Sequence, residues 1–453
     1  MRSARSGYGH VDASTCRCAD LSRIAPAGHQ VVKSTSQRRE ENVMTHLLVI
    51  SVGTEVYRRY ILEDLRAAGI RVTAVQAAPQ RPWAAPLVDV TYEVDLRDRT
   101  QVVGLTEKLH AAEPFDGVLT YDEAHVELAA EVAHALGLPG LSREAAARSR
   151  DKRLMREAFR VAGVPSAQSV LAMTADRAAE AAELIGYPVV LKPRNLGGSY
   201  GVVRVDDEER LRELFQVAVG ARIDRIDTVP GVLVEEYLEG PELSVESVVQ
   251  DGQVHICGLT EKEVGFAPYF EELGHVCRKP STYPGYAEIE RVVVAAHHAL
   301  GITYGATHSE LRITARGPRM IETAARLGGE KIPYATRLAT GVDQVALTVA
   351  ALTGGRVEVR PERELFAGVR MVYPSHDGRV RTLGHRAGAE ELWHELVWHA
   401  TPGQDMALPP RGFMTRLGHI VVVESSNEAL TARLRDSVAA LTIELDPLPA
   451  QSA

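Results

Sequence analysis

Glu310 and Glu322 lie on either side of a predicted turn at residues 315–318, within the segment HSELRITARGPRMIETAARLGGE that spans residues 308–330. The pattern predicts two short strands, and a turn centred on Arg316 makes the two acids face each other across the ladder. Carboxylates directly opposed on a sheet repel each other, and a divalent cation between them removes the repulsion. The pair therefore predicts a hard-cation site that holds Mg²⁺ against phosphate groups. A solvated hairpin with two exposed acids is the alternative.

A second pair of acids, Glu235 and Glu242, follows the apolar run at residues 231–234. That run predicts a buried strand ending in acids, and Glu242 follows a turn at Gly240-Pro241. An acid at the end of a buried strand can accept a hydrogen bond from an exocyclic amine such as that of adenine. The second acid, seven residues later, can hold ribose hydroxyls.

The segment YPVVLKPRNLGGSYGVVRV at residues 187–205 predicts a strand, a glycine-rich loop and a second strand. Lys192 would place a point charge for phosphate at a strand end, and the loop at residues 197–201 can bring backbone N–H groups close to phosphate oxygens. The segment contains neither the P-loop nor the dinucleotide fingerprint. Alone, the loop is a weak signal, because a hairpin turn has the same composition.

In this order and spacing, the segments resemble the ATP-grasp superfamily of carboxylate–amine ligases, from about residue 45 to residue 447. The resemblance rests on an ordered set of residues: Lys152, Lys192, the glycine loop, Glu235, Glu242, Glu310 and Glu322. Within the superfamily, IETAARLGG and the segment PYFEELGH at residues 268–275 look most like bacterial L-amino acid ligases that make dipeptides. One departure is Ala324, where many members carry Asn, so the second cation would have fewer protein ligands or bind water instead.

The resemblance implies an α/β (α+β) chain with the ATP-grasp fold, a Rossmann-like N-terminal domain and a C-terminal α+β lobe. It implies ATP and Mg²⁺ as cofactors, with Mn²⁺ as an alternative, and Glu310 and Glu322 as the metal ligands. The residues expected to bind ATP are Lys152, Lys192, Gly197, Gly198, Ser199, Glu235 and Glu242. The expected catalytic residues are Arg326 and Lys192, and the expected substrate-binding residues are His275, Arg326, Gly329 and Glu330.

The chemistry that follows is amide bond formation between amino acids, through an acyl phosphate, with release of ADP and phosphate. Arg326 is expected to hold a carboxylate or the developing oxyanion by a bidentate contact. Glu330 is expected to favour a cationic amino acid, and pairing of Glu330 with Lys331 or a surface arginine is the competing interpretation. A biotin-carboxylase-like or purine-pathway ligase is one alternative function, and a non-catalytic nucleotide-binding sensor is another.

Composition agrees with an enzyme that acts on small molecules. The 453 residues with 45% hydrophobic content suffice for about three domains. The net charge of −9 argues against a nucleic-acid partner, and no apolar run approaches a membrane span. Four cysteines give no disulfide framework, which favours the cytoplasm. A homodimer is one option, and a zinc site at Cys16 and Cys18 has no standard spacing.

Four parts of the chain differ in pattern. Residues 1–43 predict a disordered extension or a misassigned start before Met44. Residues 44–141 alternate apolar strand-like runs with helical spacing, which predicts a small parallel sheet covered on both faces. Residues 142–353 form the expected ATP-grasp domain, with two helices meeting near Lys152 and ending at Gly163. Residues 354–453 form the expected C-terminal lobe.

Overall fold

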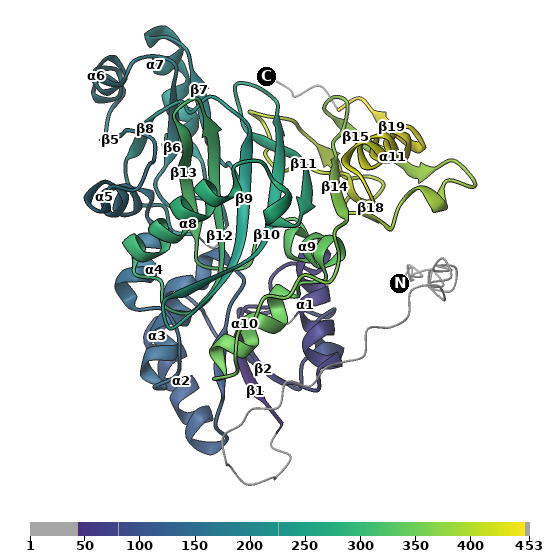
Figure 1. Ribbon diagram of the computed structural model, residues 1–453. Coiled ribbons are helices and arrows are strands. Elements are labelled where there is room, and N and C mark those ends of the chain that lie inside the picture. The colour runs from purple at the N-terminus through teal and green to yellow at the C-terminus, as the bar shows by residue number, and fades with distance from the viewer. Residues whose placement is uncertain (1–43, 80, 225, 449–453) are drawn as a thin grey trace, which may run out of the picture. The chain divides into compact units, whose positions relative to one another are not determined.

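The computed structural model describes residues 44–79, 81–224 and 226–448 (Figure 1). The expectations for residues 1–43, including the Cys16 and Cys18 zinc site, lie outside these ranges. Cys257 and Cys277 are buried free thiols. Within the described residues, no helix has the length and apolarity that crossing a bilayer requires.

The N-terminal part contains a four-stranded parallel sheet with the order β3-β2-β1-β4, which confirms the predicted parallel sheet. Its strands and helices are β1 (His46–Ile50), α1 (Glu55–Ala67), β2 (Arg71–Gln76), β3 (Val90–Glu93), α2 (Arg99–Ala112), β4 (Gly117–Leu119) and α3 (Val126–Ala135). One face packs against α2 and α3. The other packs against α1 and also against α10 (Gln344–Leu352), which comes from much later in the chain. The sequence pattern did not predict that second cover.

Helices α4 (Arg143–Arg150) and α5 (Lys152–Ala162) confirm the predicted helix pair. Asp151 separates them because its side chain accepts a hydrogen bond from the backbone N–H of Arg153 and so caps α5. Gly163 ends α5 with φ +68°, a left-handed conformation that glycine adopts without strain. Lys152 therefore stands at the first position of a helix whose start is fixed by a cap.

A small antiparallel sheet with the order β5-β8-β6-β7 follows. Its strands are β5 (Ser169–Ala172), β6 (Val189–Pro193), β7 (Val203–Val205) and β8 (Val232–Glu236). Helices α6 (Ala175–Ile185) and α7 (Glu208–Gly220) bury alanine and leucine side chains against it. The glycine-rich loop joins β6 to β7, as expected from the sequence.

The largest sheet has eight strands in the order β13-β12-β9-β10-β11-β14-β18-β16. They are β9 (Glu242–Gln250), β10 (Gln253–Gly265), β11 (Glu271–Arg278), β12 (Gly305–Thr314), β13 (Gly317–Ala324), β14 (Phe366–Val372), β16 (Glu395–Trp398) and β18 (Gly418–Glu424). Helix α8 (Tyr286–Leu300) lies against this sheet (Figure 1). Leu243 and Val245 belong to the apolar cluster of α8, while Val248 packs in the cluster of α10. Because side chains alternate along a strand, Glu242, Ser244 and Glu246 face away from α8.

The C-terminal part supplies the remaining elements: α9 (Ile332–Thr340) precedes it, and β15 (Gly378–His385), β17 (Asp405–Met406), β19 (Leu441–Asp446) and α11 (Asn427–Ala439) lie within it. Strands β15, β17 and β19 form a separate three-stranded sheet. Strands β14, β16 and β18 instead extend the eight-stranded sheet through the pairing of β14 with β11. The proposed boundaries after residues 141 and 353 remain predictions, and the sheet is continuous across the second.

Candidate active site

A cavity of about 470 Å³ is lined by residues on or next to three of the four sheets, and by Met414. The N-terminal part supplies two groups of lining residues. One is Gly53, Thr54, Tyr57 and Arg58 at the start of α1, and the other is Tyr121, Asp122 and Glu123 after β4. Nearly all predicted site residues line this cavity: Lys152, Lys192, Gly197, Gly198, Ser199, Glu235, Glu242, Glu310, Glu322, Arg326, Gly329 and Glu330. The structure therefore places the segments that the sequence singled out around one cavity.

Glu310 on β12 and Glu322 on β13 are register partners, as the predicted hairpin required. Because Thr314 pairs with Gly317, the turn is centred between Ala315 and Arg316 rather than on Arg316. A bulge between the Leu311–Met320 and Glu310–Glu322 pairs restores the facing arrangement by inserting Ile321. Met320 packs in the apolar core, so without this bulge the alternation along β13 would turn Glu322 toward the core.

The two acids have different cationic partners. Glu322 Oε2 lies 3.0 Å from Lys152 Nζ. Glu310 Oε1 accepts a hydrogen bond from Lys262 Nζ and lies 3.1 Å from His308 Nε2. Although burial alone would raise the pKa of Glu310, Lys262 and His308 hold it well below its usual value. Both acids are therefore held near the cavity by cations.

Lys262 on β10 was not predicted, although its side chain is at the centre of an acidic group. Its ammonium contacts Glu310, lies 3.1 Å from Glu272 Oε1 and lies 3.4 Å from Glu242 Oε1. Burial alone would lower the pKa of Lys262, but Glu272, Glu310 and Glu242 raise it well above its ordinary value. Lys262 thus links Glu310, one of the two predicted metal ligands, to Glu242, the predicted ribose ligand.

His308 is also a cation in this arrangement. Its Nδ1 lies 2.7 Å from Glu246 Oε1, while its Nε2 contacts Glu310. Burial alone would lower the pKa of His308, but Glu246 and Glu310 raise it to about 10. Ala324 is the register partner of His308, so the position where many members of the resembled superfamily carry Asn lies across the ladder from His308.

Glu235 is fully buried and binds two cations. Arg156 donates from Nε and Nη2 to its two carboxylate oxygens at 2.7 and 2.9 Å, and Lys192 Nζ lies 2.9 Å from Oε2. Burial alone would raise the pKa of Glu235, but Arg156 and Lys192 lower it to about 2. Arg156 also donates to the carbonyl oxygen of Ile321 at 2.6 Å, so it holds the bulged residue beside Glu322. The expected contact of Glu235 with adenine stays a prediction.

Glu242, the expected ribose ligand, accepts hydrogen bonds from Arg312 Nε and Nη2 at 3.1 and 3.0 Å. The Arg312 guanidinium lies over the rings of Tyr237 and Phe270. Tyr237 and Phe270 also line the cavity. An apolar wall with a fixed acid beside it suits a flat, hydroxyl-bearing ligand such as a nucleoside.

The glycine-rich loop is held at its base by Lys152, whose Nζ donates to the carbonyl oxygen of Leu196 at 2.6 Å. Gly198, Ser199 and Gly201 have positive φ, which leaves the loop closely turned. A Cβ on Gly201 would lie 2.4 Å from the Ala221 Cβ, so only glycine fits there. Tyr200 Oη donates to the carbonyl oxygen of Phe413 at 3.3 Å, so the C-terminal part touches this loop.

Arg326 is already paired in this structure. Its Nε donates to Glu123 at 2.5 Å, and Glu123 also accepts from Arg150. Burial alone would raise the pKa of Glu123, but Arg150 and Arg326 lower it to about 2. Contact of Arg326 with a substrate carboxylate stays a prediction, because one guanidinium can serve Glu123 with Nε and a ligand with its other N–H groups.

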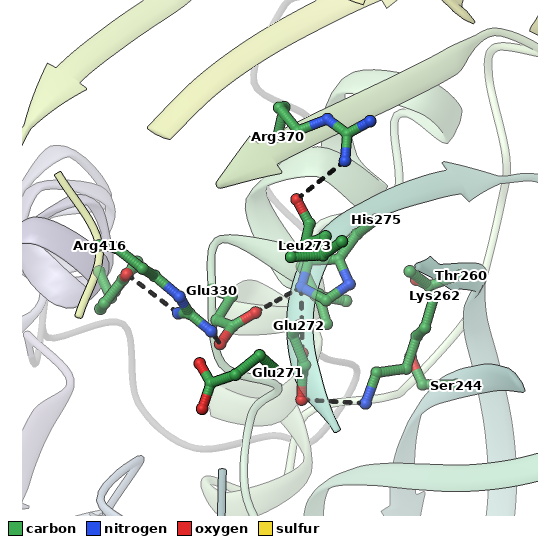
Figure 2. A network of polar contacts seen from close by, with 12 residues as sticks. Ser244, Thr260, Lys262, Glu271, Glu272, Leu273, His275, Glu330, Arg370 and Arg416 are labelled. Carbon is green, nitrogen blue, oxygen red and sulfur yellow. Dashed lines mark hydrogen bonds and ion pairs between the residues drawn. The ribbon is translucent and has the colours of Figure 1, made fainter. Parts of the chain in front are cut away.

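Glu330 lies between the guanidinium of Arg416 and the imidazole of His275 (Figure 2). Arg416 pairs with its Oε1, and His275 Nε2 lies 2.5 Å from its Oε2. Lys331 pairs with Glu395 instead, so of the competing interpretation only an arginine partner is found, and that arginine, Arg416, is buried rather than at the surface. Although burial alone would raise the pKa of Glu330, Arg416 and His275 hold it below its usual value.

His275 is not a lining residue; it lies behind Glu272 and Glu330, with its side chain fully covered. This differs from the expected position in the pocket wall, and a bulge explains it. Register pairing runs from Lys262–His275 to Val264–Glu272, so Leu273 is the inserted residue. The bulge brings Glu272 to the same face as His275 and places it between His275 and the cavity.

Glu272 lies between His275 and Lys262. Its Oε2 lies 3.2 Å from His275 Nε2, and Figure 2 shows it linking His275 to Lys262. Burial and the Glu330 carboxylate raise the pKa of Glu272 to about 8. Burial lowers the pKa of His275. The ligand atoms of Glu272, His275 and Glu330 lie within 4.8 Å of one another, but Lys262 and Arg416 already balance the two acids, so we assign no metal to this group.

The residues present fit a divalent cation and a nucleotide. Carboxylate oxygens are the ligands that hard cations prefer, and Glu310 and Glu322 offer them from facing strand positions. Arg156 Nη1 is buried without a hydrogen-bond partner, which leaves a donor beside the Glu235 end of the cavity. Glu310 and Glu322 would hold the cation, and Lys152 and Lys192 would lie beside the phosphates.

Sequence reasoning missed Lys262, Arg156, His308, Glu272, Glu123, Arg58 and Arg416, all of which contact or line the site. Arg156 had a signal, because it lies four residues after Lys152 and therefore on the same helix face. Arg416 and Glu123 had none, since they reach the site from distant segments.

Two family models match the chain: an ATP-grasp N-terminal domain at residues 62–140 and an ATP-grasp domain at residues 185–334. The phosphoribosylamine–glycine ligase of Streptomyces coelicolor is 30% identical over 83% of this chain and 91% of its own length. The chain belongs to the ATP-grasp family. It is an ATP-grasp ligase, of the class that forms carbon–nitrogen bonds, and enzymes of this family use ATP with divalent metal ions.

Two further relatives of this ATP-grasp chain have names that specify amino acids. The alanine–anticapsin ligase of Bacillus subtilis is 28% identical over 61% of this chain, and the match spans only 62% of that ligase's length. The crystal structure of an L-amino acid ligase from Bacillus licheniformis superposes with a TM-score of 0.75 and 26% identity, covering 89% of this chain and 99% of that one. The α/β ATP-grasp fold predicted from the sequence is thereby confirmed.

Proposed function

We propose that the chain joins the carboxylate of one amino acid to the amine of another, in an ATP-dependent reaction that forms a peptide bond. The observation that carries the proposal is the register pair Glu310–Glu322 on the wall of a cavity that also contains Lys152, Lys192 and Arg326. An acid pair with cations beside it suits the transfer of a phosphoryl group to a carboxylate. The amino acid ligases among the relatives support amino acids as substrates.

In the first step, a carboxylate oxygen attacks the γ phosphorus, the bond to the β-phosphate oxygen breaks, and ADP leaves. When bound, the divalent cation neutralises charge on the phosphates. Lys152 and Lys192 contribute the positive charge of the chain itself, and their carboxylate partners hold both ammonium groups in the cavity wall. We propose Mg²⁺ as the cation because both ligands are carboxylates.

In the second step, the amine attacks the carbonyl carbon of the acyl phosphate, the carbon–oxygen bond to phosphate breaks, and phosphate leaves. The attacking nitrogen gives up its extra protons as the amide forms. Arg326 is proposed to stabilise the developing oxyanion with N–H groups that Glu123 does not use. We propose no nucleophilic side chain, because an acyl phosphate is already activated.

The test is a phosphate-release screen over all pairs of amino acids with ATP and Mg²⁺, followed by mass spectrometry of the products. We expect phosphate release that depends on two amino acids and a product with the mass of their sum less one water. The Glu310→Gln variant provides the background rate. Phosphate release with no condensed product from any pair would contradict the proposal.

A second candidate function is a purine-pathway ligation, which the 30% identity to phosphoribosylamine–glycine ligase favours. Glycine with phosphoribosylamine is therefore included in the screen as an additional pair. A product from that pair alone would favour this second function over dipeptide formation.

A further inference from the structure

The lysines and arginines that line the cavity differ in one respect. Five of them have a carboxylate partner: Lys152 with Glu322, Arg156 and Lys192 with Glu235, Arg312 with Glu242, and Arg326 with Glu123. The sixth, Arg58 on α1, has no carboxylate within 4 Å anywhere in residues 44–79, 81–224 or 226–448. An arginine that stays charged in a cavity without a counterion favours an anionic ligand.

The contacts of Arg58 leave most of its donors unused. Nη1 donates to the carbonyl oxygen of Gly328 at 2.8 Å, and the guanidinium carbon lies 5.6 Å from the centre of the Tyr121 ring. Burial and the nearby charge of Arg326 lower the pKa of Arg58, although arginine remains protonated. Asp122 also lines the cavity, but its carboxylate accepts hydrogen bonds from Ser51 Oγ and the Ala124 N–H.

The N-terminus of α1 opens onto the same part of the cavity. Thr54 is the N-cap residue, its side chain makes no capping hydrogen bond, and Gly53 and Thr54 both line the cavity. The first N–H groups of a helix have no partner within the helix, and the helix dipole favours an anion there. Arg58 and this helix start therefore offer a guanidinium and backbone donors on one wall.

Arg58 contacts the segment that follows β13, because its Nη1 donates to the carbonyl oxygen of Gly328. Among the described residues it forms no ion pair with Glu310 or Glu322, whose lysine partners are Lys262 and Lys152. The carboxylate that receives the phosphoryl group must lie beside Glu310 and Glu322. An acceptor amino acid has a carboxylate of its own, which stays free in the product. This second carboxylate is the remaining substrate anion that could pair with Arg58.

We propose that Arg58, with the N-terminus of α1, binds the carboxylate of the acceptor amino acid and thereby selects amino acids over simple amines. The inference rests on the proposed function, since it assumes two substrates in one cavity. The N-terminal part of the chain then recognises the acceptor, while the strand residues Glu310 and Glu322 serve the donor. A neutral acceptor, such as an amino acid amide, would leave Arg58 without its counterion.

The experiment compares L-alanine, L-phenylalanine and L-arginine with their carboxamides. Calorimetric titration into protein loaded with a non-hydrolysable ATP analogue and Mg²⁺ measures binding without turnover, and phosphate release measures KM. We expect wild type to bind at least one free acid tenfold or more tighter than its amide. Arg58→Gln should weaken that acid at least tenfold and leave the amide unchanged, and Arg58→Lys should lie between.

Arg59→Gln is the matched control, because Arg59 is the next residue of α1 and pairs with Glu55 and Glu63 away from the cavity. It should behave as wild type. An acid-over-amide preference that survives in Arg58→Gln would overturn the proposal, and so would a wild type that binds acid and amide equally. The second comparison needs no variant and still decides if Arg58→Gln fails to fold.

Two further outcomes separate this inference from the proposed function. If acid binding depends on Arg58 but no pair of amino acids is ligated, the proposed function fails and the anion site stands. If ligation occurs and donor-stimulated phosphate release is lost in Arg58→Gln without any change in acceptor KM, Arg58 serves the donor and the present assignment is wrong.

Discussion

Glu310 and Glu322 differ from the other acids of the cavity because they face each other in register while two different lysines, Lys262 and Lys152, neutralise them. The other cavity acids, such as Glu235 and Glu123, bind two cations each from a single carboxylate. For Glu322 the first arrangement suits exchange of a lysine for a divalent ion, since only the contact with Lys152 has to be given up, whereas Glu310 also contacts His308. The second suits a fixed structural role.

The first prediction follows for the acid pair. Glu310→Gln and Glu322→Gln should each lower kcat by about 10²- to 10³-fold, because each removes one charge that stabilises the transferring phosphoryl group. Phosphate release under saturating substrate measures the loss. Glu290→Gln, at an exposed position on α8, is the control and should retain full activity. Activity within twofold of wild type in either cavity variant would contradict the assignment.

The second prediction concerns Glu235. Glu235→Gln should lower the free energy of unfolding by about 3 kcal/mol at pH 7, because it leaves Arg156 and Lys192 buried without their counterion. Urea unfolding measures this change. Glu157→Gln, whose carboxylate pairs with Arg160 on the solvent side of α5, should leave stability nearly unchanged. Equal losses in both variants would show that the buried network has no special role.

At the scale of single residues, the sequence predicted the charged residues that belong to ordered motifs. It predicted few of the oppositely charged side chains that pair with them. Lys262 lies in the stretch TEKEV, where charged residues alternate as they do on a solvent-exposed strand. From this pattern a buried lysine cannot be told from an exposed one. Its burial depends on three acids from β9, β11 and β12 that meet only in the folded sheet. No local pattern carries that information.

At the scale of elements, bulges decide which side chains reach the cavity. Ile321 in β13 and Leu273 in β11 are the inserted residues. Gly274 directly follows Leu273 and was a possible signal of irregularity, whereas no glycine or proline adjoins Ile321. Helices with clear caps, such as α4 and α5, were predicted almost to the residue, because Asp151 and Gly163 are local signals. Helix α10 was not predicted, because it is apolar on nearly every side and packs between two sheets.

The glycine loop gives the third prediction. Gly201→Ala should destabilise the protein by about 2 kcal/mol and weaken ATP binding, because the new methyl group would collide with Ala221 and Pro193. Gly163→Ala is the matched control: it also has positive φ, but its Cβ would meet open space, so only strain of about 1 kcal/mol is expected. Thermal unfolding and calorimetric titration of an ATP analogue measure the two effects. Unchanged ATP affinity in Gly201→Ala would contradict a role of the loop in nucleotide binding.

At the scale of the whole molecule, the substrate end of the cavity depends on the C-terminal part. Arg416 pairs with Glu330, and it also donates to Tyr373 Oη at 3.1 Å and to Tyr57 Oη at 3.2 Å. The guanidinium therefore joins residues from α1, from the segment before α9 and from the segment after β14. The state of Glu330 and Glu272 is set by this assembly rather than by either strand alone.

The fourth prediction is a pH dependence at Glu272. Its pKa in the folded protein is about 8, above the unfolded value, so the folded state binds more protons than the unfolded state between about pH 4.5 and pH 8. Stability should therefore fall as pH rises through this window and level off above it. Glu272→Gln should remove this part of the slope, giving a Tm above that of wild type at pH 9 and a smaller gap at pH 5. Parallel Tm curves for both proteins would contradict a protonated Glu272.

The pairing of β11 with β14 has a consequence for how the chain can be divided. A fragment that stops at residue 353 would leave one side of β11 with open N–H and C=O groups along an eight-residue strand. Such an edge is a template for another strand, and isolated fragments would associate through it. Recombination that exchanges whole catalytic segments between relatives must therefore carry β14, β18 and β16 along.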